Sequence, residues 1–261
     1  MRKLIAALGL FRLGNCLLIT LAVFLPLAIS SKDLIESLRR ASPLFLIGMC
    51  TYILNDLDDI ESDRVNHPER ALPSGIIGES LAACLYFICL GIALLTIRFS
   101  LQPSETTLYY LLLVLVINYS YVVDYFPSWK SSYVAATVAI PMFIVVQYLP
   151  SGKQYYLIAA AAALFNLGRE VCKDIIDIPG DKESVVHRIP PCQLSVFAFA
   201  LQGIAAFVLV FVVDSPLKIL ALVAIVTLYL GSVVAWFRWE DQGRAVLLMK
   251  VVLFAGLIFL M

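Results

Sequence analysis

Long apolar segments recur along the whole chain, separated by short polar connections. A helix of about 20 apolar residues is long enough to cross the hydrocarbon of a bilayer. By this criterion nine transmembrane helices are expected, at residues 5–29, 43–57, 76–97, 106–125, 131–149, 155–172, 194–213, 217–237 and 244–261. The connections are too short to hold a soluble domain. The pattern therefore predicts an all-α, multi-pass membrane protein in which residues 1–261 form a single membrane-embedded domain.

Composition agrees with this class. Hydrophobic residues make up 61% of the 261 residues and charged residues only 15%, whereas soluble domains carry about 25% charged residues. The formal net charge is zero, so no attraction to nucleic acid is expected, and no protein partner is implied. The basic and apolar start resembles a signal peptide, but Arg12 and Asn15 interrupt its apolar core, which favours a first transmembrane helix.

Lysine and arginine placement predicts the orientation. With a cytoplasmic N-terminus, twelve of these bases fall in cytoplasmic segments and six on the opposite side. Cytoplasmic loops carry the excess of Lys and Arg in membrane proteins. An integral membrane protein with a cytoplasmic N-terminus is therefore expected, with the polar connections after the second and sixth helices also cytoplasmic.

Two acidic segments stand out, "NDLDDIESD" at 55–63 and "REVCKDIIDIPGDKE" at 169–183. Each contains the spacing D-x2-D-x3-D, at Asp56, Asp59 and Asp63 in the first and at Asp174, Asp177 and Asp181 in the second. The two sets are offset by 118 residues, and the same offset relates Arg64 to Lys182 and Arg70 to Arg188. This indicates an internal repeat. Helices two to five are expected to match helices six to nine, giving two four-helix pseudo-repeats plus one helix.

The chemistry of these segments points to a metal and a phosphate. The spacing places three carboxylates on one helix face, where they repel one another unless a cation compensates. A solvated helix end is the alternative for one such segment, but two matched segments at one membrane face argue against it. Carboxylates without His or Cys neighbours suit Mg²⁺, which binds one or two carboxylates together with substrate phosphates. The interleaved bases suit a diphosphate; they are Arg64, Arg70, Lys173, Lys182 and Arg188. An apolar bundle beside such a site predicts a prenyl diphosphate donor.

The two segments also resemble a known family. "NDLDDIESDRVNHPERALPSG" is similar to the NDxxDxxxD signature of the UbiA-type intramembrane prenyltransferase superfamily, and "REVCKDIIDIPGDKE" is similar to its second signature. "FRLGNC" at 11–16 resembles the R-x-x-N segment of its first helix. Within the superfamily, the wording is closest to the geranylgeranylglyceryl phosphate prenyltransferase branch. One departure concerns a lysine that is common after the fourth helix: Val123 and Asp124 stand near that place here, and the nearest lysine is Lys130.

The resemblance implies nine helices around a central cavity and Mg²⁺-dependent transfer of a prenyl group, with release of diphosphate, to a lipophilic or aromatic acceptor whose identity stays open. It implies that Asn55 and the first three aspartates bind one Mg²⁺ and the second three another, so that all six aspartates are catalytic. Substrate-cavity roles are expected for Arg12, Asn15, Asn118, Tyr119 and Tyr121. The alternatives are snorkelling at the interface for Arg12 and Asn15 and aromatic anchoring for the tyrosines.

Two other functions fit parts of the sequence. A membrane terpene cyclase shares the scaffold and both signatures, but lets the allylic cation attack double bonds of the same substrate. A cation transporter would use the acidic segments as ion sites. Transport sites usually lie near the bilayer midplane on broken helices, whereas these carboxylates lie at one face, so an enzyme is favoured over a transporter. Transfer to an acceptor is the preferred reaction, but the sequence separates it poorly from cyclisation because both need the same metal site.

Overall fold

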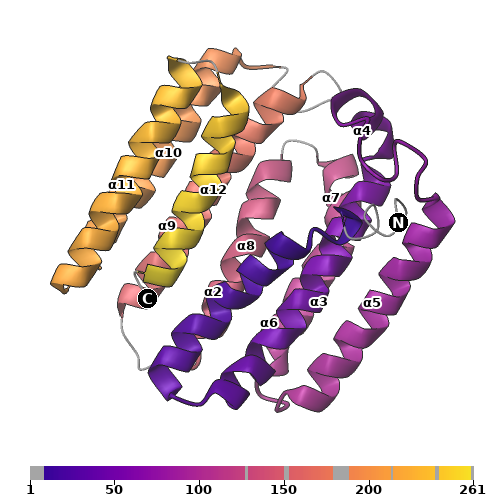
Figure 1. The fold of residues 1–261 in the computed structure, drawn as a ribbon, viewed down its shortest axis with the longest axis horizontal. Helices are drawn as coiled ribbons and strands as arrows, with labels where there is room; N and C mark the ends of the chain where they lie inside the picture. The colour runs from indigo at the N-terminus through magenta and orange to yellow at the C-terminus, as the bar shows by residue number, and fades with distance from the viewer. Residues whose placement is uncertain are drawn as a thin grey trace. The chain divides into compact units, whose positions relative to one another are not determined.

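The computed structural model describes residues 9–126, 129–149, 153–178, 188–212, 214–238 and 241–259. Within these ranges every regular element is a helix and no strand occurs, which confirms the predicted all-α class. The helices form two compact units (Figure 1). The first unit holds the first acidic segment, and the second unit holds the described part of the second.

The first unit is built around one long helix. Its helices are α2 (Leu13–Ser31), α3 (Leu34–Asp58), α4 (Ile60–Asn66), α5 (Glu79–Ser100), α6 (Thr106–Ile117) and α7 (Tyr119–Tyr125). Helix α3 packs against α2, α5 and α6. It begins at residue 34, nine residues before the predicted start. The Asp33 side chain explains the early start, because it accepts a hydrogen bond of 3.0 Å from the backbone N–H of Glu36 and caps the helix.

The second unit also centres on one long helix. Its helices are α8 (Lys130–Val146), α9 (Lys153–Asp177), α10 (Pro191–Val210), α11 (Pro216–Phe237) and α12 (Gln242–Phe259). Helix α9 packs against α8, α10 and α12, and α11 lies beside α12 (orange and yellow in Figure 1). Helices α3 and α9 are both 25 residues long. Each ends within an acidic segment.

The described chain contains eleven helices rather than nine. Helix α4 is an additional short helix, and a bend of 47° divides the fourth predicted segment into α6 and α7. Four helical segments are long and apolar enough to cross a membrane: Gly9–Ser31, Glu79–Ser100, Pro191–Val210 and Pro216–Phe237. The bent α6–α7 pair is a fifth if it counts as one span, and α8 is a shorter apolar helix. The chain thus has several membrane-length helices, while nine crossings remain a prediction.

A partly buried charged cluster lies at the N-terminal end of α3. Glu105, only 7% exposed, is 3.0 Å from Nη2 of Arg39 and 3.0 Å from Nε of Arg40. Arg39 also donates to the carbonyl oxygen of Ser100 at the end of α5, and both arginines pair with Glu36. The predicted helix bounds, 5–29 and 43–57, leave Arg39 and Arg40 in a connection. They instead tie α3 to α5 and to the start of α6.

Helices α9 and α10 approach closely at Gly168. A Cβ atom at this position would lie 2.4 Å from the carbonyl oxygen of Ala198 and 2.9 Å from Cγ of Gln202. We expect Gly168→Ala to destabilise the protein by about 1–3 kcal/mol, because the two helices must separate to admit the methyl group. Thermal unfolding in detergent measures the loss. Gly91→Ala on α5 is the control, since nothing lies within 4 Å of its Cβ position; an equal response in both variants would contradict the close approach.

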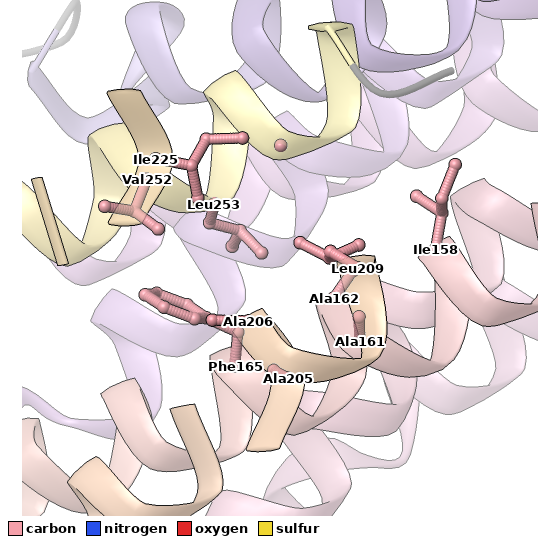
Figure 2. A pocket seen from close by; sticks show the side chains of 11 residues that line it. Ile158, Ala161, Ala162, Phe165, Ala205, Ala206, Leu209, Ile225, Val252 and Leu253 are labelled. Carbon is pink, nitrogen blue, oxygen red and sulfur yellow. The ribbon is translucent and has the colours of Figure 1, made fainter. Parts of the chain in front are cut away.

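A small cavity of about 20 Å³ lies within the second unit (Figure 2). Side chains from α9, α10, α11 and α12 line it, among them Phe165, Leu209, Ile225 and Val252. Every lining residue is apolar or glycine, so water gains no hydrogen bonds there. The cavity is therefore a small gap in the packing of the apolar interior of this unit.

Candidate active site

The first acidic segment keeps a continuous helical hydrogen-bond pattern across the boundary between α3 and α4. The N–H of Asp59 donates to the carbonyl oxygen of Asn55 at 2.9 Å, and the N–H of Asp63 donates to that of Asp59 at 2.7 Å. With 3.6 residues per turn, Asp56, Asp59 and Asp63 stay near one face. The local geometry thus agrees with the sequence pattern.

Asp56 is held by a base from the preceding helix. Its side chain is buried, with 5% of the residue exposed, and it accepts a hydrogen bond from Nη2 of Arg12. Arg12 has a left-handed backbone (φ 45°) at the start of α2, and its guanidinium lies 5.1 Å from the centre of the Tyr52 ring. A carboxylate and an aromatic face from α3 therefore fix this arginine. The structure thus brings Arg12 to the first acidic segment, and its role in a substrate cavity stays a prediction.

The other two aspartates of the first segment also have nearby partners. Asp63 is 4% exposed, and Nη1 of Arg70 lies 2.6 Å from each of its carboxylate oxygens. Nδ2 of Asn55 donates to Oδ2 of the half-buried Asp59 at 2.7 Å. Asn55 and Arg70 thus both contact aspartates of the first acidic segment. Arg64, by contrast, is exposed and pairs with Glu61 at 2.8 Å.

The second acidic segment begins at the end of α9. Asp174 is 6% exposed; Ser131 donates a hydrogen bond to its Oδ2, and Nζ of Lys130 lies 3.7 Å from its Oδ1. Asp177, the last residue of α9, is half-buried. The predicted ligand Asp181 and the predicted diphosphate contact Lys182 lie outside the described residues.

A buried carboxylate organises the bases just before Asp174. Glu170 is 6% exposed; it accepts a hydrogen bond of 2.5 Å from Nη1 of Arg169 and one of 2.9 Å from Nζ of Lys173. The two bases compensate the cost of burying this charge. Glu170 thus fixes the side chain of Lys173, a predicted diphosphate contact that lies one helical turn before Asp177. The sequence reasoning assigned no role to Glu170.

The remaining predicted site residues are more dispersed. Arg188 is exposed shortly before α10, and Asn15 is half-buried on α2. Asn118 is exposed at the α6–α7 bend, where its Nδ2 donates to the carbonyl oxygen of Val114 at 2.8 Å. Tyr119 is half-buried, and the exposed Tyr121 lies against Tyr125 with ring centres 4.5 Å apart. Asn118 thus has a structural role in ending α6.

Sequence reasoning missed four contacts of the acidic segments. Lys130 and Ser131 reach Asp174, and Tyr52 packs against Arg12. Ser120 of α7 donates to Asp58, which follows two residues after Asp56. Only Lys130 had a detectable signal, since it lies 118 residues after Arg12.

The donor set fits Mg²⁺ in its chemistry. The carboxylates of Asp59, Asp63 and Asp177 provide hard oxygen ligands at two helix ends, and Mg²⁺ needs only one or two protein carboxylates when phosphate oxygens and waters complete its octahedron. Within the described ranges no group of three or more His, Cys, Asp or Glu side chains is arranged to enclose a metal. The residues therefore suit a cation that is shared with a phosphate ligand.

An all-α chain with several membrane-length helices and carboxylates concentrated at helix ends has the features of an integral membrane enzyme that acts on an amphiphile. Comparison with known proteins makes this specific. Residues 4–256 match the UbiA prenyltransferase family, and the chain belongs to this family. It is thus a membrane prenyltransferase.

Several curated relatives carry the name digeranylgeranylglyceryl phosphate synthase. The protein of this name from Ignicoccus hospitalis is 29% identical, over 98% of this chain and 90% of its own length. That from Thermococcus kodakarensis is 28% identical, over 97% and 95%. A third, from Methanosphaera stadtmanae, is 27% identical over 69% of this chain and 66% of its own. These matches agree with the branch suggested by the sequence signatures.

Two solved structures share the fold. One, from work on digeranylgeranylglyceryl phosphate synthase in membranes, has a TM-score of 0.70 and 20% identity, covering 100% of this chain and 99% of the other. The other, an apo structure of a UbiA homologue from Aeropyrum pernix K1, has a TM-score of 0.74 and 15% identity, covering 94% and 98%. At these identities the likeness supports the fold alone.

Proposed function

We propose that this chain is a Mg²⁺-dependent prenyltransferase that joins a prenyl group from its diphosphate to geranylgeranylglyceryl phosphate, with geranylgeranyl diphosphate as donor. The relatives' shared name motivates the choice of both substrates. The observation that carries the reaction class is the pairing of carboxylates with bases in both acidic segments, at the end of α3, in α4 and at the end of α9. The proposed enzyme has nine transmembrane helices, with its N-terminus and both acidic segments on the cytoplasmic side.

The reaction exchanges one C–O bond for another. The bond between the donor's allylic carbon and its diphosphate oxygen breaks, the diphosphate keeps the electron pair, and the acceptor hydroxyl oxygen bonds to the carbon and loses its proton to water. Bound Mg²⁺ would supply charge neutralisation for the departing diphosphate. Asn55, Asp56, Asp59 and Asp63 would hold one ion, and Asp174, Asp177 and Asp181 a second.

The chain's own bases provide the remaining contacts to the leaving group. Arg70 lies beside Asp63 in the first unit, and Lys173 lies beside Glu170 in the second. Arg64, Lys182 and Arg188 complete the proposed diphosphate set. The apolar interior keeps bulk water from the allylic carbon, which would otherwise be hydrolysed.

The direct test is a product assay with purified protein. Geranylgeranyl diphosphate and Mg²⁺ are supplied with geranylgeranylglyceryl phosphate, with an aromatic acceptor, or with neither, and products are identified by mass spectrometry. Digeranylgeranylglyceryl phosphate is the expected product. A cyclic hydrocarbon formed without acceptor would establish the cyclase alternative, and an aromatic product would replace the proposed acceptor.

Arg70 offers a narrower test of the diphosphate contact. We expect Arg70→Ala to raise the donor KM about ten- to a hundredfold, because a charge-assisted contact to phosphate contributes about 1.5–3 kcal/mol. Arg70→Lys should recover only part of this, since an ammonium lacks the planar fork of a guanidinium. Donor titrations measure both, with Arg244→Ala, an exposed arginine paired with Asp241, as the control. Unchanged kinetics in Arg70→Ala would remove it from the site.

A further inference from the structure

Asp174 is contacted on both carboxylate oxygens by the start of α8. Lys130, the first residue of that helix, places Nζ 3.7 Å from Oδ1, and the next residue, Ser131, donates to Oδ2. The Lys130 side chain is 22% exposed and that of Asp174 only 9%. An ion pair with Lys130 thus balances the charge of this carboxylate, and a hydrogen bond from the adjacent Ser131 orients it.

The first unit contains the same arrangement. There a base at the start of α2, Arg12, contacts a buried aspartate, Asp56, near the end of the long helix that follows. Lys130 lies 118 residues after Arg12, and Asp174 lies 118 residues after Asp56. The chain holds 19 bases in 261 residues, so a base occurs at any one position by chance about one time in fourteen. The two bases thus occupy equivalent positions in the repeat, and each contacts the equivalent buried aspartate.

This match also sets the phase of the internal repeat. The repeat could pair predicted helices two to five with six to nine, or one to four with five to eight. The matches within residues 56–70 and 174–188 fit both possibilities, because both pair the second helix with the sixth. Only the Arg12–Lys130 match extends into the preceding helices, α2 and α8. It relates predicted helices one to four to five to eight, and leaves the ninth over rather than the first. The two compact units divide the chain at the same place, between α7 and α8.

We propose that Lys130 is a positioning residue for the second acidic segment, holding the Asp174 carboxylate in the direction a metal ligand needs, as Arg12 holds Asp56. The inference rests on the proposed function. Asp174 lies one helical turn before Asp177, so its orientation decides whether the two carboxylates can serve one ion. A buried carboxylate that loses its base turns to other donors. Lys130 acts through Asp174 and makes no contact with the reacting atoms.

Removing Lys130 has two effects on the affinity for a cation, and they have opposite signs. Measuring this affinity therefore tells which effect dominates. Loss of a positive charge alone would strengthen cation binding. Loss of orientation would weaken it, because a rotated carboxylate gives up a ligand bond. Ser131→Ala separates the two effects, since it removes the hydroxyl contact to Asp174 and leaves the charge unchanged.

The experiment measures Mn²⁺ binding to the full chain in detergent, with inorganic diphosphate present, by the EPR signal of the unbound ion. We expect the wild type to bind two ions. Lys130→Met should bind one of them at least tenfold more weakly, Ser131→Ala about three- to tenfold more weakly, and Lys130→Arg close to wild type. In turnover, Lys130→Met should lower kcat about ten- to a hundredfold with the donor KM changed less than threefold. Lys218→Met, which removes a lysine 3.2 Å from Asp214, is the matched control.

The other outcomes separate the two proposals. Equal or tighter Mn²⁺ binding by Lys130→Met and Ser131→Ala would overturn the positioning role while the proposed function stands. A raised donor KM with unchanged kcat in Lys130→Met would also overturn it, because Lys130 would then contact the diphosphate itself. If the wild type binds no Mn²⁺ with diphosphate, the proposed function fails, and this inference with it.

Discussion

Replacing Asp59 or Asp177 by Asn is expected to lower kcat for diphosphate release about a hundred- to a thousandfold. Removing one group that stabilises developing charge at an active site typically has an effect of this size, and Asn keeps the shape while losing the charge. Both aspartates are half-buried, so folding should tolerate the change. Mg²⁺-dependent diphosphate release, followed together with monodispersity in detergent, is the measurement.

Comparison variants sharpen this result. Asp56→Asn and Asp174→Asn should lose activity as well, but they should also lose thermal stability, because each leaves a base without its buried carboxylate. Asp214→Asn, an exposed carboxylate beside Lys218, should change neither property. Near wild-type release by both Asp59→Asn and Asp177→Asn would refute the two-ion site.

The second large effect concerns stability. Glu105→Gln is expected to lower the free energy of unfolding by about 1.5–3 kcal/mol, because Arg39 and Arg40 lose their charge-assisted contacts to this carboxylate and only Glu36 remains to balance them. Thermal or denaturant unfolding in detergent gives the difference from wild type. Glu79→Gln, at an exposed position on α5, should be close to neutral; a loss as small for Glu105→Gln would show that the cluster contributes nothing.

The same cluster predicts a pH dependence. Burial raises the pKa of Glu105, but hydrogen bonds from the Gln102 N–H and the two arginines outweigh it, and the net pKa lies below the ordinary value. A carboxyl whose pKa is lowered on folding contributes stability above its unfolded pKa of about 4.3. That contribution is lost as pH falls through the folded pKa. The difference between wild type and Glu105→Gln should therefore be constant above about pH 5 and shrink in more acidic solution.

The helical class and the position of most helices could be predicted because apolar segments record burial in hydrocarbon directly. The bounds of α3 and α9 could not. Both helices extend beyond their apolar segments into charged residues, where capping by Asp33 and ion pairs such as that of Glu170 replace hydropathy as the cause of helix formation. The bend at Asn118 was missed because residues 106–125 together are long and apolar enough to form one membrane span.

The acidic segments were evident from spacing, but their partners depend on tertiary structure. Arg70 lies seven residues from Asp63 and was assigned to the site with it. Arg12 and Asp56 are 44 residues apart, and Lys130 and Asp174 also 44. No local pattern reports such a pair. The repeat is the one feature of the sequence that relates them, and it does so only when its phase is known.

The charged contacts at the two ends of α3 constrain how the first unit can move. Arg12 pairs with Asp56 at one end, while Arg39 and Arg40 are tied to Glu105 at the other. These contacts are separated by about 25 Å along the helix axis, and sliding or turning α3 would break both. These contacts therefore hold α3 in place within the first unit, and with it the carboxylates at its C-terminal end. Any movement in this unit that admits a substrate must leave both sets of contacts intact.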